Sequence, residues 1–501
     1  MFHIYKGYEL VEAYHKMRMA KRFHPSEGFK KTTQAIIVLI VTLFLWNAPS
    51  EWFGIDGLTV VQQRIIAIFA FATLMWILEV VSSWATSVAI IGLMLVFASD
   101  SGIKWMCNPD EVGSLLSYKS VMATFADPVI MLFIGGFILA IAATKTGLDA
   151  QLAKVLLKPF GNKSENVLLG FILITGLFSM FVSNTATAAM MLTFLTPVFR
   201  QLPPEGKGRI AMALSIPVAA NLGGMGTPIG TPPNTIALKY LNDPEGLNMG
   251  LGFGEWMLFM TPLVIILLFL GWYLLKTLFP FSQKTVELEI EGEMKKDKHT
   301  YIVIITFFAT VALWLLDSVT GINSYTVALI PFVVFALTGV ITKRDLEQIN
   351  WSVIWMVAGG FALGYGLNAS GLAANAVKSI PFGEFSPLLI LLLSGLICYI
   401  LSNFISNSAT AALLMPILAV VCAAMGDKLD AIGGTPTVLI GVAIAASSAM
   451  VLPISTPPNA LAYATNLVQQ KDMSKIGLIM GIVSMLLGYV LLYFLGTMHV
   501  L

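Results

Sequence analysis

The stretch Ser179-Met-Phe-Val-Ser-Asn-Thr-Ala-Thr-Ala-Ala-Met190 occurs again as Ser402-Asn-Phe-Ile-Ser-Asn-Ser-Ala-Thr-Ala-Ala-Leu413. A second motif, Thr-Pro-Pro-Asn, is paired in the same order, at 231–234 and 456–459. Ser406 follows Ser183 by 223 residues, and Thr456 follows Thr231 by 225. Two motifs with conserved order and nearly constant spacing indicate an internal repeat that covers most of the chain.

The composition places both repeats in a membrane. Of the 501 residues, 57% are apolar and only 11% are charged, whereas soluble domains carry about 25% charged residues. Continuous apolar runs of roughly 20 residues recur along the chain, which is typical of spanning helices rather than of barrel strands. We therefore expect an all-α polytopic membrane protein with the lipid bilayer as its surroundings. The net charge of +1 does not indicate the excess of basic residues that binds nucleic acid. We expect no cofactor.

The apolar runs predict about 11 transmembrane helices, two re-entrant hairpins and two broken helices. Each repeat would hold five spans and one hairpin. Because five is odd, the second repeat would lie upside down relative to the first, as in many secondary transporters. The predicted organisation is a cytoplasmic basic arm (1–31), a first span and loop (32–59), repeat 1 (60–279), a cytoplasmic linker (280–299) and repeat 2 (300–501).

The hairpins are predicted at 166–199 and 387–425, each as two apolar arms of roughly 14 residues around a polar centre. The broken helices are predicted at 209–241 and 436–466. Proline cannot continue a preceding helix but suits the first helical position, so each Thr-Pro-Pro-Asn should start a new helix with its threonine as the N-cap.

The distribution of basic residues among the loops predicts the orientation of the chain in the membrane. With the N-terminus in the cytoplasm, the Lys- and Arg-rich stretches at 145–163, 200–209, 276–298 and 343–344 all fall inside, which satisfies the positive-inside rule. The C-terminus would then be extracellular. We expect an integral protein of a bacterial plasma membrane.

The hairpin tips carry the expected chemistry. Ser183-Asn184-Thr185 and Ser406-Asn407-Ser408 stand where a fresh run of helix formers begins. A helix start presents free N–H groups and about half a positive charge, so it can bind an anion without lysine or arginine. Two such tips suit a solute with an anionic group at each end, which favours a transporter over an enzyme.

Each motif taken alone also has a purely structural interpretation. A single Ser-Asn-Thr is usually helix packing, and a single Thr-Pro-Pro-Asn is usually a kink; pairing at the repeat spacing favours a site. The glycine pairs 135–136 and 359–360 are expected to be close-packing positions. Four charged residues near span ends are expected to reach the interface: Glu79, Lys145, Lys239 and Asp317. A cation/proton antiporter is the alternative function, although neither tip nor either break contains Asp or Glu.

With these paired motifs, the chain resembles the divalent anion/sodium symporter (DASS) family of dicarboxylate and citrate carriers over about residues 30–500. The resemblance implies secondary transport of C4 and C5 dicarboxylates such as succinate, malate, fumarate and 2-oxoglutarate. It also implies a homodimer and an elevator mechanism of alternating access, run either as Na⁺-coupled symport or as Na⁺-independent dicarboxylate exchange (antiport).

Site residues follow from the resemblance position by position. The substrate would be bound by Ser183, Asn184, Thr185, Thr231, Ser406, Asn407, Ser408, Thr456 and Pro457. In a sodium-coupled member, Na⁺ would be held by Ser183, Asn184 and the carbonyl of Gly230 on one side, and by Ser402, Asn407 and the carbonyl of Ser455 on the other. Ser408 departs from the family's usual threonine, so the hydroxyl is kept while a methyl that would shape the site is lost.

Overall fold

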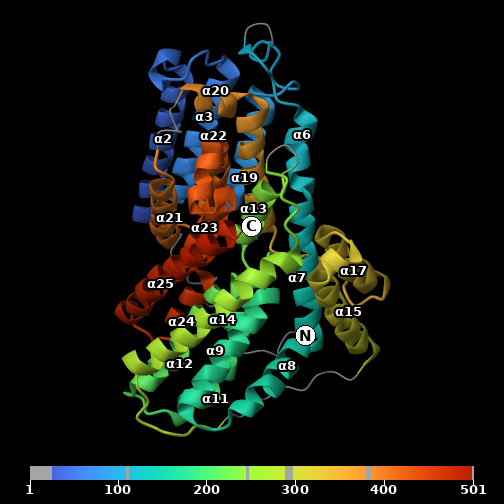
Figure 1. The fold of residues 1–501 in the computed structure, drawn as a ribbon, viewed down its shortest axis with the longest axis vertical. Coiled ribbons are helices and arrows are strands. Elements are labelled where there is room, and N and C mark those ends of the chain that lie inside the picture. The colour runs from blue at the N-terminus through green and yellow to red at the C-terminus, as the bar shows by residue number, and fades with distance from the viewer. Residues whose placement is uncertain (1–24, 109–111, 244–246, 288–296, 380–384, 499–501) are drawn as a thin grey trace.

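The computed structural model describes residues 25–108, 112–243, 247–287, 297–379 and 385–498 (Figure 1). Within these ranges the chain is helical, with two isolated bridges and no extended strand. The predicted all-α architecture is therefore confirmed. Most of the basic arm at 1–31 and much of the linker at 280–299 lie outside the described residues.

The main helices of the two repeats occur in the same order, while the short helices α11 and α16 each belong to one repeat alone. Repeat 1 runs through α3 (Val60–Ile77), α4 (Ser83–Phe97), α6 and α7 (Tyr118–Ala123, Pro128–Thr146), α8 (Leu148–Leu157), α9 (Ser164–Phe181), α10 (Asn184–Phe194), α11 (Thr196–Gln201), α12 (Lys207–Gly224), α13 (Pro232–Leu241) and α14 (Phe253–Leu278). Repeat 2 runs through α15 (Lys298–Leu315), α16 (Asp317–Thr320), α17 (Ser324–Leu337), α18 (Lys343–Leu346), α19 (Trp351–Ala369), α20 (Leu372–Ser379), α21 (Pro387–Phe404), α22 (Asn407–Met425), α23 (Gly434–Ser447), α24 (Pro457–Ala464) and α25 (Gln470–Thr497). Before them stands α2 (Pro25–Asn47).

Both hairpins and both broken helices are present. Hairpin 1 consists of α9 and α10 with α11, and hairpin 2 consists of α21 and α22. The expected arm length of roughly 14 residues is wrong: α9 and α21 have 18 residues, α22 has 19 and α10 has 11. Three of the four arms are longer, in α9 because the flanking polar residues Ser164 and Glu165 join the first helical turn, whereas α10 is shorter because it ends at Phe194 and α11 begins at Thr196.

Nine helices of the described residues are long and apolar enough to cross a membrane, and three of these are hairpin arms. Helices α4, α17 and α23 are apolar but shorter. Length and composition alone therefore do not separate spanning helices from hairpin arms in this chain, and the repeat has to be used to assign them.

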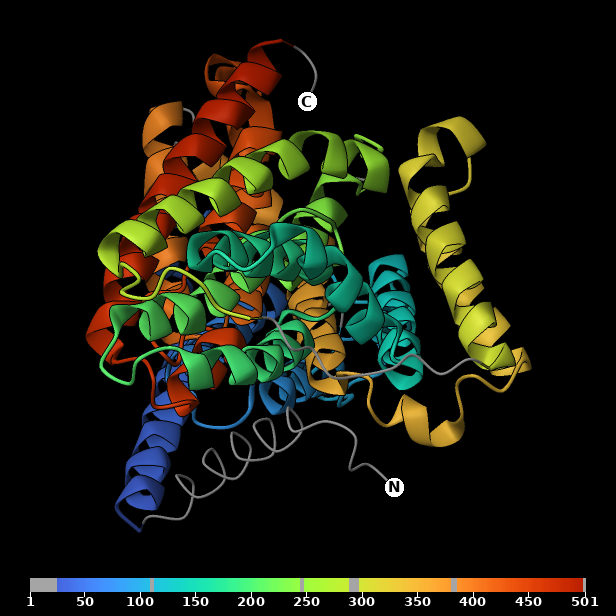
Figure 2. The same ribbon diagram turned by 90° about the horizontal axis from the view of Figure 1, so that it is seen from below.

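The repeats are interlocked rather than side by side. Helix α4 of repeat 1 packs on α19 of repeat 2, and α17 of repeat 2 packs on α7 of repeat 1. Likewise α13 lies against α22 of hairpin 2, while α24 lies against α10 of hairpin 1. Hairpin 1 occupies the lower part of Figure 1 and hairpin 2 the upper part, and Figure 2 shows α15 and α17 as a separate layer on one side.

The expected close packing is confirmed at Gly135, Gly359 and Gly360 but not at Gly136, where a β-carbon would meet Ile229 at an ordinary 3.4 Å. A β-carbon at Gly135 would lie 2.1 Å from the Ala328 carbonyl oxygen in α17, and one at Gly359 would lie 2.7 Å from the Ser87 Cα in α4. These glycines let helices of opposite repeats approach backbone to backbone, because small residues permit close contact between membrane helices.

Candidate functional site

Each hairpin turns at one extended residue followed by a capped helix start. Val182 ends α9 with φ −118° and ψ 150°, and the Ser183 hydroxyl then accepts a hydrogen bond from Ala186 N at 3.4 Å. In hairpin 2, Ile405 is extended and the Ser406 hydroxyl accepts from Ala409 N at 3.2 Å. The serines therefore cap new helices, as their position before a helix-forming run predicts.

The side-chain oxygen of each tip asparagine contacts the hydroxyl of the serine five residues earlier. Ser179 Oγ lies 2.6 Å from Asn184 Oδ1 and 2.7 Å from the Ala220 carbonyl. Ser402 Oγ lies 3.1 Å from Asn407 Oδ1, and 3.2 Å from the carbonyl of Ala446. Both serines are fully buried. The tip asparagines are thus tied to the broken helix of their own repeat, on equivalent contacts.

The tips themselves are half-buried. Ser183, Asn184, Thr185, Ser406 and Asn407 are all of intermediate exposure, while Ser408 is buried. The structure brings the first five to accessible positions at two helix starts, where free N–H groups can meet a ligand. Ser408 lies one step further into the core, with 9% of its surface exposed.

Each helix break is clamped by the asparagine of Thr-Pro-Pro-Asn. Asn234 Nδ2 donates to the carbonyls of Gly224 at 3.0 Å and Thr227 at 2.8 Å. Asn459 Nδ2 donates to the carbonyls of Met450 at 2.8 Å and Leu452 at 3.0 Å. These side chains satisfy carbonyls that the interrupted helices leave unpaired. The sequence interpretation did not include either asparagine, although their place in the repeated motif was the available signal.

The threonines before the prolines differ between the repeats. Pro232 and Pro457 are the first residues of α13 and α24, as predicted. Thr456 caps its helix by accepting from Asn459 N at 3.3 Å, whereas Thr231 occupies the cap position without a side-chain cap bond. The expectation of a threonine N-cap therefore holds only for repeat 2. Both threonines are buried, and Pro457 is exposed.

Two of the groups expected to hold a cation in repeat 1, Asn184 and the Gly230 carbonyl, lie beside Gly224. A β-carbon built on Gly224 would lie 2.8 Å from Asn184 Nδ2, 2.9 Å from Asn184 Oδ1 and 3.1 Å from the Gly230 carbonyl oxygen. Only a glycine leaves this space open. Amide and carbonyl oxygens are ligand types that suit a hard cation, whereas the Asn184 NH₂ group in the same space is a donor.

Hairpin 2 is joined to its break through Asn403. Asn403 Oδ1 accepts from Val451 N at 2.9 Å, and Ser455 Oγ donates to the Asn403 carbonyl at 3.0 Å. In repeat 1, Thr227 Oγ1 donates to the Met180 carbonyl. The Ser455 hydroxyl thus connects hairpin 2 to the helix break. Because the hydroxyl is used in this contact, the Ser455 carbonyl is the group left for a cation.

Charged residues near the site are paired rather than free. Lys239 Nζ lies 2.5 Å from Asp127 Oδ2 and 5.0 Å from the centre of the Phe361 ring. Lys145 Nζ lies 2.6 Å from Asp345 Oδ2. Both lysines are therefore paired with a carboxylate, and their expected position at the membrane interface stays a prediction. The segments 179–190, 223–235, 402–413 and 450–459 contain no charged residue at all.

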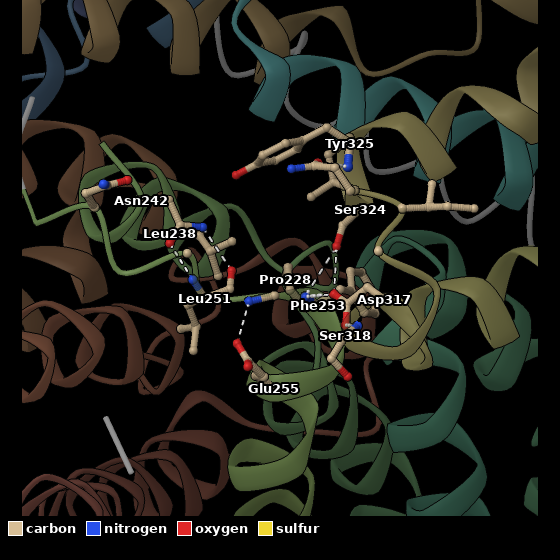
Figure 3. A pocket seen from close by; sticks show the side chains of 17 residues that line it. Pro228, Leu238, Asn242, Leu251, Phe253, Glu255, Asp317, Ser318, Ser324 and Tyr325 are labelled. Atoms are coloured by element: carbon tan, nitrogen blue, oxygen red, sulfur yellow. Dashed lines mark hydrogen bonds between the residues drawn. The ribbon is translucent and has the colours of Figure 1, made fainter. Parts of the chain in front are cut away.

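A pocket of about 470 Å³ lies between the end of α13 and the starts of α14 and α17 (Figure 3). Two carboxylates, Glu255 and Asp317, face it. Asp317 is buried and accepts from Phe253 N at 2.7 Å and Ser324 Oγ at 3.0 Å, so its carboxylate is held inside the protein. Since no hairpin-tip residue lines this pocket and its charges are negative, it is not the candidate site for an anionic solute.

The fold and the duplicated motifs define an all-helical membrane protein built from two interlocked repeats, and the family and relatives named next make it a transporter, not an enzyme. The chain belongs to the citrate transporter family (CitMHS), whose sequence profile matches residues 73–433. It is 29% identical to the sodium-dependent dicarboxylate transporter SdcS of Staphylococcus saprophyticus, covering 92% of this chain and 89% of that one. It is 32% identical to an uncharacterized transporter of Haemophilus influenzae, covering 83% and 88%.

Two solved structures share the fold at low sequence identity. The YdaH transporter of Alcanivorax borkumensis gives a TM-score of 0.52 at 14% identity, over 75% of this chain and 87% of that chain. Neisseria gonorrhoeae MtrF gives a TM-score of 0.50 at 13% identity, over 82% and 94%. At these identities the likeness concerns the fold alone.

Proposed function

We propose that this protein is a secondary transporter of C4 and C5 dicarboxylates: succinate, malate, fumarate or 2-oxoglutarate. One observation carries the proposal. Two capped helix starts, each with a serine and an asparagine at an accessible tip, recur in opposite repeats without any charged side chain. Helix starts with neutral donors bind carboxylates, and one at each end of the solute matches a dianion.

The substrate would lie between the tips, with one carboxylate at Ser183, Asn184 and Thr185 and the other at Ser406, Asn407 and Ser408. Thr231, Thr456 and Pro457 would line the site. Sodium-dependent dicarboxylate transport in the SdcS relatives supports this assignment.

Sodium is the coupling ion that the chain supports best. Asn184 Oδ1 and the Gly230 carbonyl lie beside Gly224, and Ser183 precedes Asn184 in the same tip. The equivalent groups in repeat 2 are Ser402, Asn407 and the Ser455 carbonyl. A bound cation would supply positive charge behind each carboxylate, while the chain's own residues position the substrate.

Movement would follow the family's elevator mechanism within a homodimer. Both hairpins with α12, α13, α23 and α24 would form the moving domain, since these elements pack on one another across the repeats. The remaining spans would form the scaffold and the contact between protomers. The N-terminus would lie in the cytoplasm and the C-terminus outside.

Transport into proteoliposomes tests the proposal. Purified protein is reconstituted with and without internal succinate, and uptake of labelled succinate is measured with and without an inward Na⁺ gradient. Uptake that requires the gradient supports symport, and uptake that requires internal dicarboxylate but ignores Na⁺ supports exchange. Absence of succinate, malate, fumarate and 2-oxoglutarate uptake under all conditions would contradict the proposal, and proton flux after a Na⁺ pulse would instead favour an antiporter.

A further inference from the structure

One hydrogen-bonded side chain crosses between the two repeats at the level of the helix breaks. Asn221, in the last turn of α12, donates from Nδ2 to Thr456 Oγ1 at 3.1 Å and lies 3.2 Å from Asn459 Oδ1. Its exposed fraction is 3%. Asn221 belongs to repeat 1, whereas both partners belong to the break of repeat 2.

The orientation of this carboxamide is determined by its surroundings. Asn459 gives both Nδ2 contacts to the carbonyls of Met450 and Leu452, so its Oδ1 must be the atom that faces Asn221. An acceptor there requires that Asn221 present its NH₂ group. The same NH₂ group therefore also faces the Thr456 hydroxyl.

The contacts leave the Thr456 hydroxyl with a single role. A threonine hydroxyl has two acceptor lone pairs and one proton to donate. Thr456 Oγ1 accepts from Asn221 Nδ2 at 3.1 Å and from Asn459 N at 3.3 Å. With both acceptor positions used, the hydroxyl can only donate, which is the property that a substrate carboxylate requires.

Repeat 1 lacks this arrangement. Ser179 donates to the Ala220 carbonyl in repeat 1, and Ser402 donates to the Ala446 carbonyl in repeat 2. The residues that follow these alanines, Asn221 and Ser447, are therefore equivalent. Ser447 Oγ is buried without a hydrogen-bond partner. Across the described ranges, no side-chain hydrogen bond to the Thr231 hydroxyl is found either.

We propose that Asn221 is a positioning residue that fixes the Thr456 hydroxyl as a donor to the substrate and thereby makes the two half-sites unequal. In repeat 2 the Thr456 hydroxyl is oriented before substrate arrives. In repeat 1 the Thr231 hydroxyl is oriented only when substrate binds. This inference rests on the proposed dicarboxylate site and adds a residue to it.

The test uses the reconstituted full chain with succinate, under whichever driving condition supports wild-type uptake. Asn221→Ala is expected to raise KM about five- to tenfold with Vmax changed less than about twofold, because one oriented hydrogen bond to a carboxylate is lost. The matched control is Ser447→Ala, which removes a hydroxyl without a partner and should leave both constants unchanged. Absence of uptake by the wild-type protein would count against the proposed function, not against the role of Asn221.

A double-mutant cycle separates positioning from packing. In Thr456→Val the hydroxyl is gone, so adding Asn221→Ala should raise KM less than about twofold further. Equal effects of Asn221→Ala in the Thr456 and Thr456→Val backgrounds, or an unchanged KM in folded Asn221→Ala, would overturn the proposal.

Folding is checked independently by the monodisperse fraction in detergent. If Asn221→Ala does not fold, Asn221→Ser replaces it in the cycle, since the shorter side chain keeps a polar group beside Asn459. Loss of folded protein in both variants would assign Asn221 to the structural core and would also overturn the proposal.

Discussion

Neutral residues carry the proposed binding of a dianion, and Asn184 and Asn407 are at its centre. Each presents a carboxamide whose oxygen is already engaged by a buried serine, Ser179 or Ser402. The oxygen is thereby used as an acceptor, which leaves the NH₂ group as the donor that the proposal assigns to the substrate. The tip asparagines therefore combine a proposed donor for substrate with an oxygen held by a buried serine.

Asn184→Ala and Asn407→Ala should each reduce succinate uptake more than about tenfold, because hydrogen bonds to a charged ligand are worth about 1.5–3 kcal/mol. The folded yield should remain near wild type. Uptake in proteoliposomes is the measurement, with Thr187→Val as the control, since the Thr187 hydroxyl is buried without a partner. Near-normal uptake in either alanine variant would remove the half-site assigned to that asparagine.

The Lys145–Asp345 pair gives a prediction about stability. Burial raises the pKa of Asp345, but hydrogen bonds from Lys145 and from the Thr342 backbone and hydroxyl outweigh it, so the pKa lies below its ordinary value of 3.8. A carboxyl with a depressed pKa stabilises the fold at neutral pH, and this contribution is lost as the pH falls through the folded-state value.

Asp345→Asn should therefore lower the unfolding free energy at pH 7 by about 1 kcal/mol, a value kept small because Lys145 is partly exposed. Thermal unfolding in detergent is compared for variant and wild type at pH 7 and at pH values below 3.8. The difference between them should shrink at acid pH. A difference that is independent of pH would show that the charge of Asp345 contributes nothing.

At the scale of elements, close helix pairs such as α7 with α17 depend on single glycines. Gly135 and Gly136 are neighbours in α7 but meet different surroundings. A β-carbon at Gly135 would strike the Ala328 carbonyl at 2.1 Å, while one at Gly136 would meet Ile229 Cδ1 at an ordinary 3.4 Å.

Gly135→Ala is expected to destabilise the protein by about 1–3 kcal/mol, since the neighbouring backbone has to move. Gly136→Ala serves as the matched control and should unfold within a few degrees of wild type. The midpoint of thermal unfolding in detergent measures both. Equal midpoints for the two variants would contradict close packing of α7 on α17 at Gly135.

Much at this scale could be predicted from the sequence. Both breaks begin new helices at the predicted prolines, and both tips turn at the predicted serines, because these residues act through local backbone geometry. Asn221 could not be found, since its partners are more than 230 residues away and the other repeat has Ser447 in its place. Three of the four hairpin arms were underestimated because periodicity does not reveal where polar flanking residues join a helix.

For the whole molecule, inversion of the repeats predicts opposite sides for equivalent loops. Asp56 precedes α3 at the start of repeat 1, and Ser282 precedes α15 at the start of repeat 2; both are exposed. With the N-terminus in the cytoplasm, Asp56 would lie outside and Ser282 inside.

Asp56→Cys should react with a membrane-impermeant thiol reagent in intact cells, and Ser282→Cys only after permeabilisation. The three native cysteines are buried, so the unmodified chain serves as the control. Labelling of both variants from the same side would contradict the inverted arrangement.

The exchange of helices between repeats has a consequence for biosynthesis. Helix α24 ends at Ala464 and rests on α10 and α12, while α13 rests on α22. A nascent chain that has delivered only repeat 1 to the membrane therefore lacks the surfaces that cover its own hairpin and broken helix. During translation, these polar, helix-interrupting segments must wait in the translocon or the lipid until almost the entire polypeptide has emerged, and only then can both half-sites assemble together.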